Sequence, residues 1–291
     1  MDKPCIGFIG QGWIGKNYAD DFEKRGYKTV RYALEAPYAQ NKEKIKDCDI
    51  VFIAVPTPTT PKGFDASIVD ASLSLVGAGK IAVIKSTMLP GTTAQLAQAH
   101  PGIVVLASPE FLTEATAAHD AAHPNRNISG LGMDTPEYRA AAQQVLAVLP
   151  KAPFEQVCKA TEAELIKYGG NNWFYFKVIF INLLYDLSRE LGADYDVIRE
   201  GMAADPRVGP SHLIPVHKSG TLGSDNFGLF EKKDQEGKRG AGGHCFIKDF
   251  AAFAQLYREH FPDDAEGVAV LNSLEQKNIK LLTSTGKDLV L

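Results

Sequence analysis

The first half of the chain alternates short apolar runs with polar, proline-containing loops. These runs predict strands at residues 5–9, 28–32, 50–55, 81–85, 103–107 and 127–131. A continuous apolar run is typical of a parallel strand that is covered on both faces, and helices are expected between the strands. The pattern therefore predicts an α/β fold with a doubly wound sheet.

The pattern changes in the second half, where the apolar spacing indicates a long helix over residues 162–191. Its second half is apolar nearly all round, and such a helix is buried in a core or between subunits. Gly169 and Gly170 form a local fault in the helix, beside Lys167 and Asn171 on one face. Interior glycines cost roughly 1 kcal/mol each relative to alanine, so we expect a packing or ligand reason for the pair.

Two amphipathic helices are expected near the end, at residues 246–260 and 266–282. They follow an irregular region in which residues 221–238 show no periodicity, and we expect this segment to be a mobile excursion or lid. We divide the chain into a sheet domain over residues 1–158 and a mainly helical domain over residues 159–291.

A glycine-rich turn, Gly10-Gln11-Gly12-Trp13-Ile14-Gly15, follows the first predicted strand and precedes a helix. This is the G-x-G-x-x-G pattern in the strand, turn and helix context that dinucleotide binding requires. Gly10 permits the turn, Gly12 lets a pyrophosphate approach, and Gly15 allows the helix to pack closely on the strand. The helix N-terminus then faces the phosphates. We therefore expect a Rossmann-like domain that binds NAD.

The second predicted strand should end near an acidic residue that binds the ribose hydroxyls of the dinucleotide. Ala33 stands where that acid is first sought, and Glu35 follows twenty residues after Gly15. Arg31 could instead accept the 2′-phosphate of NADP. We expect NAD with Glu35 at the ribose, and the alternative for Glu35 is a solvated loop carboxylate.

Several predicted strands end in polar or proline-containing loops, and the first residues of these loops are Pro56, Ser86 and Ser108. The carboxyl ends of parallel strands meet at one edge of an open α/β sheet, and ligands bind at that edge. The loops therefore predict a binding site there.

A second glycine-rich stretch runs from Arg239 to Asp249 and places three glycines in four residues before His244 and Cys245. Glycine is tolerated where the backbone takes unusual dihedrals or where a ligand approaches closely. If the next helix starts at Phe246, Cys245 lies at its N-terminus, where the dipole and the free N–H groups favour a thiolate. Asp249 then lies one turn further along the same face. We interpret Cys245 as a nucleophile.

The composition narrows the class of protein. The chain has 291 residues, of which 45% are hydrophobic and 23% charged, and a net charge of -4 gives no reason to expect nucleic acid as a partner. No apolar run reaches about 18 residues and no signal peptide is evident, so no membrane span is expected. Four scattered cysteines lack the spacing of a zinc site or a disulfide framework. We expect no metal and a reducing, cytoplasmic location.

Seven blocks in order along the chain resemble the UDP-glucose/GDP-mannose dehydrogenase family, whose members oxidise nucleotide sugars at the primary alcohol. The resemblance extends from Ile6 to about Asn272. The blocks are the glycine turn, Val55-Pro56-Thr57-Pro58, Lys85-Ser86-Thr87 with Pro90-Gly91-Thr92-Thr93, Ser108-Pro109-Glu110-Phe111-Leu112, Ala163-Glu164-Leu165-Ile166-Lys167-Tyr168 with Asn171, Asp205-Pro206-Arg207-Val208-Gly209, and Gly242-Gly243-His244-Cys245 with Lys248-Asp249.

The resemblance implies a four-electron oxidation of an alcohol to an acid, with two NAD equivalents consumed in turn. Cys245 would add to the intermediate aldehyde as a covalent nucleophile, and water would hydrolyse the thioester that the second oxidation forms. Oxyanions develop at the addition and at the hydrolysis, and a fixed cation and an amide dipole lower those barriers. Lys167 and Asn171 match the family residues with that task.

The resemblance also implies three groups of site residues. The catalytic group is Cys245, Lys167, Asn171, Asp249, Thr87 and Glu110. The NAD-binding group is Gly10, Gln11, Gly12, Trp13, Ile14, Glu35, Val55, Pro56, Thr57, Ser86, Thr87 and Glu114. The substrate-binding group is Glu110, Phe111, Leu112, Lys167, Asn171, Arg207, Gly242 and Gly243. Within the catalytic group, the carboxylates and Thr87 would orient water or transfer protons.

A homodimer built on residues 162–191 is a further implication, with Arg207 reaching the neighbouring active site; a local salt bridge is the alternative for Arg207. Relatives usually carry a third α/β domain that holds much of the nucleotide, and the sequence ends where that domain would begin. We expect the grip on the nucleotide to be reduced, replaced by residues 221–238, or supplied by a partner.

The substrate is left open among several alternatives. UDP-glucose, oxidised to UDP-glucuronate, is favoured because Lys248-Asp249 and Lys167-Tyr168 resemble that branch of the family, whereas His244 resembles the N-acetylhexosamine branch. The same chemistry on a UDP-N-acetylhexosamine or on GDP-mannose is the first alternative. A single-step dehydrogenase of the 3-hydroxyacid type and a non-catalytic nucleotide-sugar or dinucleotide sensor are the others.

Overall fold

The computed structural model of the chain describes residues 3–60, 63–113, 116–217 and 237–286, and for residues 59, 60, 217, 244 and 245 it describes the backbone alone. The chain forms two compact units, residues 1–167 and 168–291. Helix α6 (Ala160–Glu190) contributes its first residues to one unit and the remainder to the other. The functional division at residues 158 and 159 stays a prediction.

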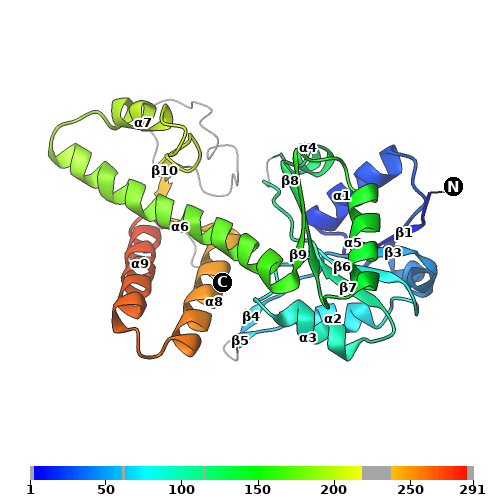
Figure 1. The fold of residues 1–291 in the computed structure, drawn as a ribbon. Coiled ribbons are helices and arrows are strands. Elements are labelled where there is room, and N and C mark those ends of the chain that lie inside the picture. Colours follow the sequence, from blue (N-terminus) through cyan, green and yellow to red (C-terminus); the bar gives the residue numbers. More distant parts are fainter. Residues whose placement is uncertain (1–2, 61–62, 114–115, 218–236, 287–291) are drawn as a thin grey trace. The chain divides into compact units, whose positions relative to one another are not determined.

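The first unit is built on a seven-stranded sheet in the order β2-β1-β3-β6-β7-β8-β9 (Figure 1). Neighbouring strands pair in parallel except β7 and β8, which are antiparallel. This arrangement confirms the predicted Rossmann-like α/β fold. The strands are β1 (Ile6–Ile9), β2 (Thr29–Tyr32), β3 (Ile50–Ile53), β6 (Ile81–Ile84), β7 (Val104–Ala107), β8 (Arg126–Leu131) and β9 (Phe154–Lys159).

The central strands form because their residues are apolar on both faces. Every residue of β1, β3, β6 and β7 is buried, which requires cover on both sides of the sheet. The rings of Phe8, Phe22 and Phe52 lie with centroids 5.4 Å apart in each pair, and they join strands β1 and β3 to the helix after β1. This core fixes the carboxyl ends of the strands, where the predicted loops begin.

The remaining elements of the first unit are short. They are α1 (Trp13–Lys24), the 3₁₀ helix η1 (Ala39–Asp47), α2 (Ser67–Leu73), α3 (Thr92–Ala99), α4 (Ala117–Ala122), α5 (Pro136–Val148) and a two-stranded ribbon of β4 (Thr59–Thr60) and β5 (Gly63–Phe64). The sequence pattern predicted neither η1 nor β9. Strand β9 lies at the sheet edge and most of its residues are exposed, so its sequence contains no apolar run that would predict a strand.

The second unit is helical. Beyond its part of α6 it contains α7 (Tyr195–Ala203), α8 (Gly243–His260), α9 (Ala265–Ser284) and the antiparallel pair β10 (Val216–His217) and β11 (Lys238–Arg239). The ring of Tyr175 on α6 stacks on Phe250 of α8 with a centroid distance of 4.0 Å. The two helices expected at residues 246–260 and 266–282 are confirmed.

Two other expectations turn out differently. Helix α6 runs without a break through Gly169 and Gly170, so the predicted local fault is wrong. Gly169 lies in open space, where a Cβ would meet no atom within 4 Å. The segment predicted as a lid lies almost entirely outside the described residues. Over the part of the chain that is described, no helix is long and apolar enough to cross a membrane.

Candidate active site

The glycine turn joins β1 to α1, and its three glycines have different roles. Gly10 has a φ of 90°, and a Cβ there would lie 2.1 Å from the Ala54 oxygen. A Cβ on Gly15 would lie 2.0 Å from the Gly10 oxygen, so the fold itself requires both glycines. At Gly12, the N-cap of α1, a Cβ would meet nothing within 4 Å. Open space beside unpaired helix N–H groups fits the pyrophosphate of a dinucleotide.

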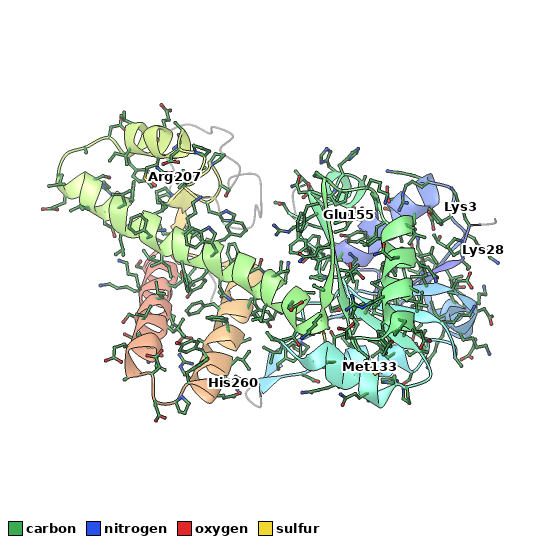
Figure 2. The ribbon with its side chains drawn as sticks, viewed as in Figure 1. Lys3, Lys28, Met133, Glu155, Arg207 and His260 are labelled. Atoms are coloured by element: carbon green, nitrogen blue, oxygen red, sulfur yellow. The ribbon has the colours of Figure 1, made fainter. Side chains whose placement is uncertain are left out.

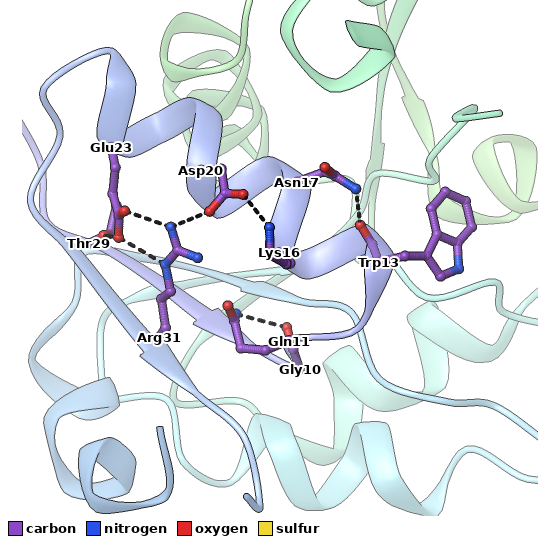
Figure 3. Close-up of polar contacts among 9 residues, drawn as sticks. All are labelled: Gly10, Gln11, Trp13, Lys16, Asn17, Asp20, Glu23, Thr29 and Arg31. Carbon is purple, nitrogen blue, oxygen red and sulfur yellow. Dashed lines mark hydrogen bonds and ion pairs between the residues drawn. The ribbon is translucent and has the colours of Figure 1, made fainter. Parts of the chain in front are cut away.

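Arg31 on β2 is bound to helix α1 (Figure 3). Its Nη2 lies 2.7 Å from Asp20 Oδ1 and 2.6 Å from Glu23 Oε2. Its Nε donates to Glu23 Oε1 at 2.9 Å, and only 10% of the side chain is exposed. An arginine held by two carboxylates has little capacity left for the 2′-phosphate of NADP, so these contacts favour NAD.

Glu35 lies in the turn after β2 and is exposed. The Gly10 N–H donates to the Tyr32 oxygen at 2.9 Å, which brings the end of β2 beside the glycine turn. Among the described residues no hydrogen bond or ion pair reaches the Glu35 carboxylate. Binding of a ribose by Glu35 stays a prediction. Glu114, the other acid in the predicted NAD group, lies outside the described residues.

The loops after β3 and β6 are bound to each other. The Ser86 hydroxyl accepts the Val55 N–H at 2.9 Å and donates to the Val55 oxygen at 2.7 Å. The Thr57 hydroxyl donates to the Thr87 oxygen at 2.9 Å. Four residues of the predicted NAD group thus form one hydrogen-bonded ledge at the carboxyl ends of neighbouring strands.

Lys167 and Glu110 form a buried ion pair within the first unit. The Lys167 Nζ donates to Glu110 Oε1 at 2.7 Å and to the Glu110 main-chain oxygen at 2.8 Å. Their side chains are 7% and 3% exposed. The other carboxylate oxygen of Glu110 accepts the Leu112 N–H at 2.7 Å. Two residues predicted as catalytic from distant parts of the sequence therefore hold one another in place.

The ring of Phe111 lies near two cations. The guanidinium of Arg126, the first residue of β8, lies 3.8 Å from the ring centroid, and the Lys167 Nζ lies 5.8 Å from it. Because β8 runs antiparallel to β7, its first residue lies at the edge where β7 ends. Burial lowers the pKa of Arg126. The cation–π contacts fix the ring of a residue that we predict to touch the substrate.

The first turns of α6, which belong to the first unit, are held there by Glu164. Its carboxylate accepts the Gly91 N–H at 2.6 Å and the Thr93 N–H at 2.9 Å. These two residues flank the start of α3, whose orphan N–H groups Glu164 therefore caps. Burial raises the pKa of Glu164 above its ordinary value, against the effect of the hydrogen bonds from Thr93 and Gly91. The contact fixes α6 one turn before Lys167.

The predicted nucleophile lies in the first turn of α8. That helix begins at Gly243, not at Phe246 as predicted, and its N-cap is Gly242. Gly240 and Gly243 have φ values of 91° and 83°, which a side chain rarely tolerates. Cys245 is the third residue of the helix, and the structure describes its backbone only.

Asn278 on α9 holds the turn before α8. Its amide nitrogen donates to the Ala241 oxygen at 2.8 Å, and its amide oxygen accepts the Ala241 N–H at 2.7 Å. The side chain is 2% exposed. A buried amide that satisfies both main-chain groups of one residue fixes the glycine-rich stretch where α8 starts.

Asp249 and Asn171 meet within the second unit. The Asn171 Nδ2 donates to Asp249 Oδ2 at 2.6 Å. The Lys248 Nζ lies 3.0 Å from Asp249 Oδ1, as an ion pair that lacks hydrogen-bond geometry. Asp249 is 1% exposed. The amide predicted to stabilise an oxyanion thus also holds the carboxylate that lies one turn beyond Cys245.

Arg207 lies in the turn after α7 (Figure 2). Its Nη2 is 2.6 Å from Asp205 Oδ2, and 88% of its side chain is exposed. This is the local salt bridge that the sequence left as an alternative. A contact with a neighbouring subunit stays a prediction.

The sequence analysis did not identify five residues that lie in or beside the candidate site. They are Lys85, Ser108, Arg126, Glu164 and Asn278. Lys85, Ser108 and Glu164 stand inside the family blocks, which was the only available signal, and nothing in the local sequence pairs them with their partners. Over the described residues, no cluster of three or more His, Cys, Asp or Glu side chains could hold a metal ion.

Two family models match the chain, and together they cover well over half of it. Residues 27–149 match the NAD binding domain of the UDP-glucose/GDP-mannose dehydrogenase family. Residues 161–225 match the central domain of the same family. The glycine turn lies before the first matched range, so its dinucleotide role rests on its own geometry.

Curated relatives are similar at low identity. UDP-glucose 6-dehydrogenase of Rickettsia conorii is 28% identical over 269 residues, which cover 89% of this chain and 55% of the relative. UDP-glucose 6-dehydrogenase TuaD of Bacillus subtilis is 29% identical over 260 residues, which cover 83% of this chain and 50% of the relative. The chain spans about half the length of the curated relatives it matches.

Solved structures show the same fold. The UDP-glucose dehydrogenase of Pyrobaculum islandicum superposes with a TM-score of 0.75 at 24% identity, over 96% of this chain and 68% of that one. The 3-hydroxyisobutyrate dehydrogenase of Mycobacterium tuberculosis has a TM-score of 0.68 at 14% identity, over 98% of this chain and 95% of that one. The two family matches, on this fold, show that the chain belongs to the UDP-glucose/GDP-mannose dehydrogenase family and contains its NAD-binding and central domains.

Proposed function

We propose that the chain oxidises the primary alcohol of a nucleotide sugar to the acid with NAD, and that its substrate is UDP-glucose. The observation that carries the proposal is the position of Cys245 in the first turn of α8, four residues before Asp249. A helix N-terminus lowers the pKa of a thiol and so favours the nucleophilic thiolate. The bond between Asn171 and Asp249 supports the same assignment.

The residues of the glycine turn and of the ledge formed by Val55, Thr57, Ser86 and Thr87 would hold NAD, with Glu35 at the ribose. Bound NAD supplies the hydride acceptor for both oxidation steps. The open space at Gly12 is the feature that most favours this placement, since a pyrophosphate needs close approach to the backbone.

In the proposed reaction the Cys245 thiolate adds to the carbonyl carbon of the aldehyde, so a carbon–sulfur bond forms and the oxygen takes the negative charge. The Lys167 ammonium and the Asn171 amide stabilise that oxygen. Lys167 suits this task because Glu110 fixes its Nζ at 2.7 Å, and a preorganised cation needs no reorientation when charge develops.

Hydrolysis completes the proposed cycle. Water attacks the thioester carbon, the carbon–sulfur bond breaks, and the thiolate of Cys245 is restored as the acid leaves. Thr87, Glu110 and Asp249 are the groups that would orient this water or take its proton. Phe111, Leu112, Gly242 and Gly243 would contact the sugar nucleotide.

We further propose that the protein forms a homodimer through α6. Large apolar side chains along α6 and directly after it are exposed, and their spacing places them along one stripe: Trp173 (60%), Phe180 (57%), Leu187 (54%) and Leu191 (72%). An exposed apolar stripe of this kind is typical of an interaction surface. Arg207 would then reach the neighbouring site.

The experiment that tests the proposed chemistry measures NADH formation with UDP-glucose, UDP-N-acetylglucosamine, UDP-N-acetylmannosamine and GDP-mannose, with NADP as the control cofactor. We expect turnover with UDP-glucose and NAD. Turnover with another sugar nucleotide and none with UDP-glucose would overturn the choice of substrate but not the reaction.

The cysteine is tested by Cys245→Ser, with Cys158→Ser on β9 as the matched control. The serine variant should bind NAD normally and form no acid, while the control retains acid formation. Full acid production by Cys245→Ser would exclude the thioester. A single-step dehydrogenase, for which the fold alone gives a precedent, would release one NADH per substrate and be indifferent to thiol alkylation.

A further inference from the structure

Lys85 is a buried lysine to which the proposed reaction gives no task. It directly follows β6 and is 3% exposed. Its Nζ lies 3.0 Å from the Ser108 Oγ, which follows β7, and 4.6 Å from the centroid of the Tyr18 ring on α1. Among the described residues no carboxylate forms an ion pair with it.

Two charged groups act on Lys85 from neighbouring elements. The Glu110 carboxylate, two residues after Ser108, attracts a positive charge on Lys85, and the Lys167 ammonium on α6 repels it. Both oxygens of Glu110 already accept hydrogen bonds, Oε1 from Lys167 and Oε2 from the Leu112 N–H. The facing group on α1 is the Tyr18 phenol, which Asp21 and Asp120 influence in turn, and whose pKa burial raises. Among the described residues, Lys85 therefore has a second lysine nearby and no carboxylate in an ion pair with it.

The charge of Lys85 follows from its burial without a paired carboxylate. Burial lowers the pKa of Lys85 to about 7, with repulsion from Lys167 adding to the effect and attraction from Glu110 opposing it. Above neutral pH the side chain is an amine that can both donate to and accept from the Ser108 hydroxyl.

We propose that Lys85 is a positioning residue for Glu110: as an uncharged amine it binds Ser108, fixes the Ser108-Pro109-Glu110 segment, and leaves Lys167 as the cation of the Glu110 carboxylate. When Lys85 takes up a proton, a second ammonium attracts the same carboxylate and weakens its hold on Lys167. The expected effect of Lys85 on turnover rests on the proposed function. The uncharged state of Lys85 in the folded protein does not.

The first experiment needs no turnover. The unfolding equilibrium constants of the wild type and of Lys85→Met are measured in urea between pH 7 and pH 9.5. The unfolded wild type binds a proton at Lys85 that the folded protein does not, so its unfolding constant should fall, relative to the variant, by about tenfold per pH unit. A difference that does not change with pH would overturn the uncharged state.

A direct measurement covers the case in which Lys85→Met does not fold. In wild-type protein labelled with ¹³C at lysine Cε, one lysine resonance should titrate near pH 7, far below the ordinary range. Lys85→Arg removes that resonance and so assigns it. If the resonance lost in Lys85→Arg titrates in the ordinary range near pH 10, the proposal is wrong.

The second experiment measures kcat against pH with UDP-glucose and NAD. The wild type should lose activity below pH 7, and Lys85→Met should lack that acid limb. Lys85→Arg, which is always charged, should have a kcat about tenfold lower at pH 8 with an unchanged KM for NAD. An identical acid limb in the wild type and in Lys85→Met would overturn the positioning role. If no sugar nucleotide yields NADH, the proposed function fails, and the pH dependence of unfolding then decides the charge of Lys85.

Discussion

The two units of the molecule each bury one carboxylate of the predicted catalytic group, and they hold it by different means. In the first unit Glu110 is paired with a lysine, Lys167, at 2.7 Å. In the second unit Asp249 accepts from a neutral amide, Asn171, at 2.6 Å, and its nearest cation, Lys248, lies 3.0 Å away without hydrogen-bond geometry.

This difference separates a carboxylate that is paired with a buried cation from one that is held by a neutral amide. Removing Lys167 would leave the buried charge of Glu110 without its ion-pair partner, which is costly. Asp249 sits beside a lysine whose side chain is 19% exposed and can reach solvent. The predictions below test this contrast, from the largest expected effect to the smallest.

Lys167→Met should have the largest effect on stability. It leaves the Glu110 carboxylate buried without its cation, and breaking a buried ion pair from one side costs about 3–5 kcal/mol of unfolding free energy. Urea unfolding at pH 7.5 measures the loss. The double variant Lys167→Met with Glu110→Gln should regain most of the stability, and a double variant as unstable as the single one would contradict the account.

Asn171→Ala should cost less. The Asp249 carboxylate loses one hydrogen bond but keeps Lys248 nearby, so we expect a loss of about 1–3 kcal/mol. The same urea titration measures it. A loss equal to that of Lys167→Met would mean that the two carboxylates are held alike and that the contrast is wrong.

Glu164 provides a third buried carboxylate, which accepts from the main-chain N–H groups of Gly91 and Thr93. Because burial raises its pKa in the folded protein, the wild type loses stability as the pH rises above the ordinary value of 4.5 and through the raised pKa. Glu164→Gln removes this dependence, so the wild type should lose stability relative to the variant between pH 4.5 and pH 7, as urea unfolding measures. Glu190→Gln, at the exposed end of α6, removes a carboxylate from the same helix without touching this contact and serves as the control.

Lys248→Met should have the smallest effect. The ion pair with Asp249 is partly exposed and lacks hydrogen-bond geometry, so its loss should cost about 1 kcal/mol or less. Raising the salt concentration should shrink the difference between this variant and the wild type. A salt-independent loss of several kcal/mol would show that Lys248 is as fixed as Lys167.

The sequence predicted the sheet and the long helix because each strand of the core is an apolar run and α6 has helical periodicity. It also predicted the glycine turn, since the backbone itself requires glycine at Gly10 and Gly15 and the open space at Gly12 completes the pattern. Strand β9 was missed because a half-exposed edge strand has no apolar run. The start of α8 was placed three residues late because glycine is a poor signal for a helix start.

The partners within the site could not be predicted. Lys167 and Glu110 are 57 residues apart in the sequence, and Asn171 and Asp249 are 78 apart. Their pairing depends on which strand end and which helix turn meet in the folded chain. The shortage of carboxylates around Lys85 is likewise a property of packing, since the block Lys85-Ser86-Thr87 gives no hint that the lysine is buried.

The central claim is that this chain carries out two successive oxidations on one sugar through Cys245. The most direct test counts NADH released per molecule of UDP-glucose when the sugar nucleotide is limiting and NAD is in excess. The account predicts two NADH and UDP-glucuronate as the product. One NADH per UDP-glucose, with an aldehyde or another singly oxidised product, would contradict it.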